Sequence, residues 1–116
     1  SNFSTVKKTR VQLSQLQLNR DYAEQQLRMQ MRSYMNNMTA SAEQVSSNKE
    51  AIVQAQKGRD IAQTLYDVGR GTVLELNSAE VALTQSELTY SQSVFDWLTA
   101  KADLDKLVGV DYVESN

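Results

Sequence analysis

Few residues of this chain are of the types that catalyse reactions or bind metal ions. The 116 residues include no cysteine and no histidine. Disulfides, thiolate metal sites and imidazole proton transfer are therefore excluded. Asp103 and Asp105 could suggest a calcium site. On a helix, however, residues two positions apart point to different sides, so we interpret these carboxylates as solvated charges. No phosphate-binding loop, dinucleotide glycine pattern or nucleophile elbow is present. We expect no catalytic site, no cofactor and no metal, and predict that the chain is not an enzyme.

Two further features could bind a ligand or a partner. The stretch Gly69-Arg70-Gly71 is typical of a turn between helices, which we prefer to a phosphate cradle. Tyr90 and Trp97 alternate with leucines, and this favours packing in a core over ligand stacking. Arg70 would lie at the outermost point of the turn, where contact with a partner and simple solvation are both open.

The elements that position these residues are predicted to be two long helices. Proline is absent, and glycine occurs only at positions 58, 69, 71 and 109. Most other residues are good helix formers. We predict helices over about residues 3–68 and 73–108, joined by a turn over 69–72, in one domain spanning residues 1–116. They would be about 100 Å and about 55 Å long.

The turn carries the clearest local signals. Gly69 can adopt the left-handed conformation that closes a helix. Thr72 and Glu75 have the spacing of a capping box, in which each side chain accepts the other residue's backbone N–H. Because the connection is short, the helices must run antiparallel. Gly109 is expected to end the second helix.

The second helix has apolar residues in two series, each with a seven-residue repeat. One series is Leu76, Leu83, Tyr90, Trp97 and Leu104; the other is Leu74, Val81, Leu88, Phe95 and Ala102. The series are offset by two positions, or about 200° around a helix. Since one seam suffices for a two-stranded coiled coil, this helix is predicted to lie between two neighbours.

The first helix has a single, interrupted apolar stripe at three- and four-residue steps. Its members are Val6, Leu13, Leu16, Ala23, Leu27, Met31, Tyr34, Met38, Val45, Ile52, Ala55, Ala62 and Leu65. The second helix should reach back to about Arg32, which leaves roughly the first thirty residues unpaired. A hairpin of two helices cannot cover all these surfaces. We therefore predict that it belongs to a larger assembly, and that the isolated chain self-associates through residues 6–32.

Composition narrows the class of protein further. No window approaches the 18 apolar residues of a membrane-spanning helix, and the first residues lack a signal-peptide pattern, so we expect a soluble segment. Basic residues exceed acidic ones up to Val68, and acidic residues dominate beyond it. The basic residues are too dispersed, and too poor in interleaved aromatics, to indicate nucleic-acid binding.

Residues 62–109 resemble the TolC family of outer-membrane efflux proteins. The resemblance rests on a tyrosine, a glycine, a hydroxyl residue, an acidic residue and an alanine at the family's spacing: Tyr66, Gly69, Thr72, Glu75 and Ala79. Leu104 and Gly109 match the family's habitual helix ending. The sequence departs from the family at Asn77, which is usually leucine. It also departs at Gly71, where some members have a gating arginine.

This resemblance implies a fold and a role. The chain would be an antiparallel coiled-coil hairpin from the periplasmic α-barrel of a trimeric outer-membrane protein. Cargo would reach it from an inner-membrane pump through a periplasmic adaptor protein, and membrane contact would come only from other parts of the protein. The tip would dock the adaptor and gate the opening, through Tyr66, Gly69, Arg70, Gly71, Thr72 and Glu75.

Two alternatives remain open from the sequence. Periplasmic adaptor proteins also contain a two-helix coiled-coil hairpin, normally flanked by lipoyl-like strands. A cytosolic coiled-coil scaffold is the other candidate, and it would have a single seam.

Overall fold

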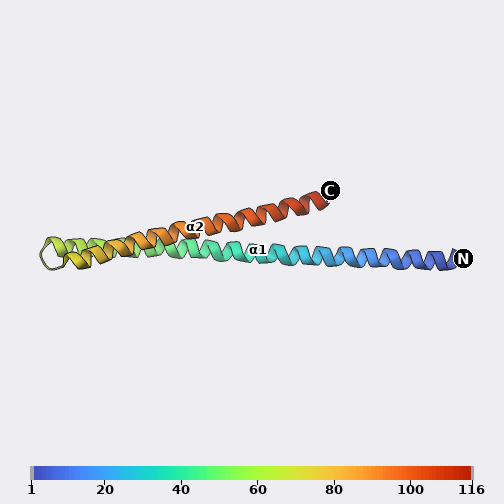
Figure 1. Ribbon diagram of the computed structural model, residues 1–116, viewed down its shortest axis with the longest axis horizontal. Coiled ribbons are helices and arrows are strands. Elements are labelled where there is room, and N and C mark those ends of the chain that lie inside the picture. Colours follow the sequence, from blue (N-terminus) through green and yellow to red (C-terminus); the bar gives the residue numbers. More distant parts are fainter. Residues whose placement is uncertain (1, 116) are drawn as a thin grey trace.

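The chain forms an antiparallel hairpin of two unequal helices (Figure 1). The computed structural model describes the backbone of residues 2–115 and the side chains of residues 2–109. Helix α1 spans Asn2–Asp67 and helix α2 spans Val73–Ser115. The hairpin is 101 Å long and 19 Å by 15 Å across. The predicted all-α hairpin is confirmed, and the observed bounds of α1 differ from the predicted ones by one residue at each end.

The predicted end of α2 at Gly109 is wrong, because α2 continues to Ser115. Glycine closes a helix when it adopts a positive φ, and within the described residues only Gly69 does so. Inside a helix, glycine costs only about 0.5–1 kcal/mol relative to alanine. With no proline after it, Gly109 weakens α2 without ending it.

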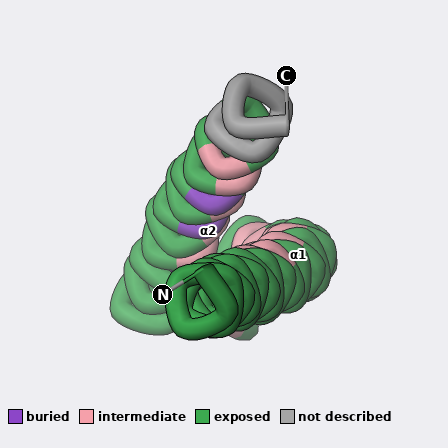
Figure 2. The backbone as a smooth tube through the Cα atoms, turned by 90° about the vertical axis from the view of Figure 1, so that its right-hand side faces the viewer, coloured by how far each residue is buried: buried purple, intermediate pink, exposed green. Residues whose placement is uncertain are grey.

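The two helices meet along one seam on each helix, which we call the inner seam. Its residues are buried or half-buried and recur at alternating steps of three and four, as in a coiled coil. On α1 they are Leu27, Met31, Tyr34, Met38, Ser41, Val45, Asn48, Ile52, Ala55, Arg59 and Ala62. On α2 they are Leu76, Ala79, Leu83, Ser86, Tyr90, Ser93, Trp97, Ala100, Leu104 and Leu107. The first predicted series of α2 therefore faces α1 (Figure 2).

Large residues of one helix lie level with small residues of the other. The Asn48 Nδ2 group donates to the Thr89 carbonyl oxygen at 3.5 Å, which sets Asn48 level with this turn of α2. Because the helices are antiparallel, steps back along α1 match steps forward along α2. Val45 then lies level with Ser93, and Ser41 with Trp97. This alternation of sizes lets the helix axes approach closely.

The alternation stops toward the open end of the hairpin. There both seams carry large residues, Met31 and Tyr34 on α1 and Leu104 and Leu107 on α2. Two large side chains in one layer need more room than a large and a small one. Helix α2 diverges from α1 along this part of its length (Figure 1).

The second predicted series of α2 lies in solvent, and we call it the outer seam. Leu74, Val81, Leu88 and Phe95 are 73%, 68%, 61% and 64% exposed. Ala102, the last member of the series, is also exposed. These residues lie opposite the inner seam, as the offset of two positions requires. An exposed apolar row of this length marks a contact surface.

The N-terminal part of α1 is also exposed to solvent. Residues 2–26 are all exposed, so the predicted overhang is confirmed. Val6, Leu13 and Leu16, which are members of the predicted apolar stripe, lie in this overhang and are exposed. Met31 and Met38 pack in the inner seam, whereas Met29 and Met35 point to solvent.

Replacing a small inner-seam residue by a large one should force the helices apart. Ala100 is 5% exposed, so Ala100→Leu should overpack its layer and lower the stability of the hairpin by about 1–3 kcal/mol. Thermal unfolding followed by circular dichroism measures this. Ala102→Leu makes the same chemical change two positions away at an exposed site. It should leave the melting temperature nearly unchanged, and equal losses in both variants would contradict the packing described above.

Candidate functional site at the hairpin tip

The end of α1 is closed by a Schellman motif. Gly69 has φ +78°, the left-handed conformation predicted from the sequence. Its N–H donates to the Tyr66 carbonyl oxygen at 3.1 Å, and the Arg70 N–H donates to that of Leu65 at 2.8 Å. These are the two bonds that define the motif. They stop the helix and turn the chain sharply toward α2.

Gly71 makes the turn tighter still. Its N–H donates to the Leu65 carbonyl oxygen at 2.9 Å. A Cβ atom at position 71 would lie 3.1 Å from the Leu65 Cβ and 3.1 Å from the Tyr66 nitrogen. The turn therefore packs against the last turn of α1, and any side chain at position 71 would push it away.

The predicted capping box begins α2. The Glu75 N–H donates to the Thr72 Oγ1 at 3.1 Å, and the Thr72 N–H donates to the Glu75 Oε2 at 3.4 Å. The first helical bond, from the Leu76 N–H to the Thr72 carbonyl oxygen, measures 3.2 Å. The Glu75 carboxylate also lies near the positive end of the α2 dipole, where a negative charge is favourable.

The tip presents apolar side chains and one arginine to solvent. Tyr66 is 44% exposed, and Val68, Val73 and Leu74 are exposed as well. Arg70 is exposed, and it takes part in neither of the two ion pairs that form among the described residues. All six residues singled out in the sequence therefore lie at the tip. Val68, Val73 and Leu74 were not recognised as part of it, although apolar residues flanking a glycine turn could have indicated them.

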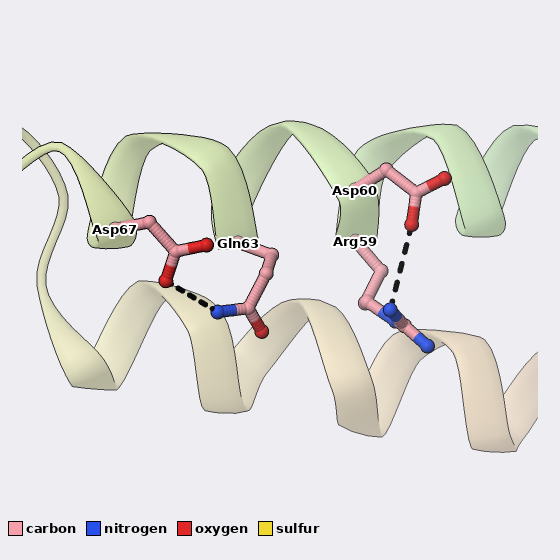
Figure 3. Close-up of polar contacts among 4 residues, drawn as sticks. All are labelled: Arg59, Asp60, Gln63 and Asp67. Carbon is pink, nitrogen blue, oxygen red and sulfur yellow. Dashed lines mark hydrogen bonds and ion pairs between the residues drawn. The ribbon is translucent and has the colours of Figure 1, made fainter.

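Polar contacts behind the tip stay within α1. The Gln63 Nε2 donates to the Asp67 Oδ1 at 2.9 Å, and the Arg59 Nη1 lies 3.5 Å from the Asp60 Oδ1. Figure 3 shows Arg59 and Gln63 extending from α1 toward α2. The other ion pair of the described residues, Arg20–Glu24, also lies in α1. Opposite charges on the two helices thus form no bridge across the described part of the hairpin.

The described residues contain no cluster of acidic side chains able to hold a metal ion. None of the described helical stretches is both long and apolar enough to cross a membrane. The arrangement at the tip is suited to contact with another molecule through shape and apolar surface, with Arg70 adding a positive charge.

Comparison with known proteins identifies the family. The family model for outer membrane efflux proteins matches residues 1–110. The chain belongs to this family. It is also 26% identical over 79 residues to outer membrane protein TolC of Escherichia coli strain K12, which covers 68% of this chain and 16% of TolC. No solved structure matches the chain. The chain spans about a sixth of the length of this relative.

The three glycines near the tip should respond differently to alanine. Gly69→Ala puts a Cβ atom on a residue with positive φ, and should lower the stability of the hairpin by about 1–2 kcal/mol. Gly71→Ala should also destabilise it, through contact with Leu65. At Gly58 nothing lies within 4 Å of an added Cβ atom, so Gly58→Ala should raise stability by about 0.5–1 kcal/mol.

Chemical denaturation of the three variants measures these differences. A stabilising effect of Gly69→Ala would contradict the left-handed turn. In the hairpin, nothing lies within 4 Å of a Cβ atom added at Gly58. A destabilising effect of Gly58→Ala would therefore show that another helix packs against this part of α1.

Proposed function

We propose that this chain is a periplasmic hairpin of an outer-membrane efflux protein, which forms part of the wall of a helical duct and docks a periplasmic adaptor at its tip. The outer seam of α2 carries the proposal. A second apolar row on a helix that already packs against α1 requires a second neighbour. Each helix in the wall of an α-barrel has two such neighbours.

The neighbour on the outer seam would be a helix from another part of the same protein or from another protomer of a trimer. The members of the outer seam are spaced by seven residues, so a partner helix can pack along its whole length. The exposed apolar residues of the α1 overhang, among them Phe3, Val11 and Leu18, would be covered in the same way. The duct would carry small molecules or proteins outward.

The tip is the proposed docking and gating point. Its backbone is held by the Schellman motif and the capping box, so Tyr66 and Arg70 project from a preorganised turn. An adaptor protein would contact this surface and link the duct to an inner-membrane pump. The family match favours this function over the adaptor hairpin and the cytosolic scaffold.

Removing the side chains at the tip should impair export. In the complete protein, Tyr66→Ala and Arg70→Ala should each reduce drug export and weaken adaptor binding, because an aromatic residue and an arginine are the residue types that most often dominate such contacts. Drug accumulation in cells and pull-down of the adaptor measure these effects. Lys57→Ala, an exposed site further along α1, is the matched control and should behave as wild type. Normal export and docking in both tip variants would remove the role proposed for these residues.

The isolated chain should self-associate, because its exposed apolar surface has no cover within one hairpin. The contacts are expected through residues 6–32, where Val6, Leu13 and Leu16 are exposed. Sedimentation equilibrium measures the oligomeric state over a range of concentrations. A helical chain that stays monomeric at high concentration would contradict this prediction.

A further inference from the structure

Two grooves of different chemistry run along the two sides of the inner seam at mid-length. One groove, which we call the polar flank, is lined by Leu88 of the outer seam and otherwise by polar residues of both helices, among them Gln44, Asn48, Gln85, Thr89, Gln92 and Asp96. The other, which we call the apolar flank, is lined by Ala42, Val45, Tyr90, Val94 and Trp97. On α2, Thr89 and Val94 lie about 70° to either side of the inner seam, so the two grooves face opposite ways.

Side chains of the polar flank are held by hydrogen bonds to one another. The Gln44 Nε2 donates to the Asn48 Oδ1 at 3.1 Å, and the Gln92 Nε2 donates to the Asp96 Oδ1 at 3.0 Å. Asn48 is buried to 9% exposure and also donates to the Thr89 carbonyl oxygen on α2. The groove therefore presents an array of amide and carboxylate groups that are ordered by hydrogen bonds.

This polar character extends along α2 beyond the groove. Ser78, Gln85, Gln92 and Thr99 follow one another at steps of seven residues and therefore lie on one side of α2. All four are polar and uncharged. On the other side of α2, the mirror-image position carries Thr84, Ser91 and Leu98, and the position nearer the inner seam carries Val94 and Lys101. The Lys101 Nζ lies 5.7 Å from the centre of the Trp97 ring, over an aromatic surface that is only half-buried.

We propose that the polar flank lines the passage of the duct and that the apolar flank faces its outside. This inference rests on the proposed duct. In such a wall, α1 covers the inner seam of α2 and a neighbouring helix covers its outer seam, so the two remaining sides of α2 face the passage and the exterior. A hydrated lining of amide and hydroxyl groups lets polar and amphipathic cargo pass. An exposed row of Tyr90, Val94 and Trp97 would retain apolar cargo by burying its surface.

Single cysteines test this assignment, since residues 1–116 contain none. Gln85→Cys and Gln92→Cys place a thiol on the polar flank. Glu87→Cys and Ser91→Cys are matched controls at nearly the same levels, on the side of α2 that carries Val94. Any cysteine elsewhere in the complete protein is first replaced by serine. The protein is then placed in a planar lipid bilayer, and its conductance is recorded before and after addition of a cationic methanethiosulfonate reagent.

We expect conductance to fall in steps at positions 85 and 92, to recover on reduction, and to stay unchanged at 87 and 91. Mass spectrometry confirms that all four thiols have reacted. A fall at 87 and 91 alone, an equal fall at all four positions, or no fall at any would each overturn the assignment. Failure of the proposed duct is distinguishable, because the cysteine-free protein would then show no conductance before any reagent is added.

Discussion

The structure depends on one constraint, which is that α2 has apolar residues on two opposite sides. Leu76, Leu83 and Trp97 pack toward α1, while Val81 and Phe95 point away from it into solvent. A helix gains most of its stability from tertiary packing of its apolar surface, so a helix with two such surfaces is complete only between two neighbours. The hairpin supplies one neighbour. We propose that the other comes from elsewhere in the assembly.

The inner seam determines how the remaining surfaces are presented. Its large residues lie level with small ones, which brings α1 and α2 close together over most of their shared length. The turn at Gly69 and Gly71 fixes where this pairing begins, and the bond from Asn48 to the Thr89 carbonyl oxygen adds a polar contact at mid-length. With the pairing fixed, the outer seam, the polar flank and the apolar flank each have a defined direction. The exposed residues of the tip are likewise held at the end of a rod 101 Å long.

Much of this could be predicted from the sequence, because the signals are local. The capping box of Thr72 and Glu75, the left-handed Gly69 and the seven-residue repeats of α2 depend on near neighbours along the chain, and all were confirmed. Gly109 misled the prediction, since glycine ends a helix only when its backbone adopts the left-handed form, and residue type alone does not decide this.

Features that depend on the contact between the helices were harder to predict. Asn48 and Arg59 lie in the inner seam of α1, although the apolar pattern gave no reason to include a polar and a charged residue. Their place became clear only from the pairing with α2. The small residues Ser86 and Ser93 were overlooked for the same reason. The exposed apolar residues beside the tip, Val68 and Val73, belong to no seam, so the seven-residue repeats did not point to them.

The most direct test of the central claim asks whether the outer seam is covered in the complete protein. Val81 is 68% exposed in the hairpin, and Val81→Cys changes little in side-chain volume. The rate at which this thiol reacts with a maleimide can be compared in the folded protein and in the same protein unfolded in denaturant. A second helix packed on the outer seam predicts much slower reaction in the folded protein. Equal rates in the two states would show that this surface has no neighbour, and would contradict the account of the chain as part of a duct wall.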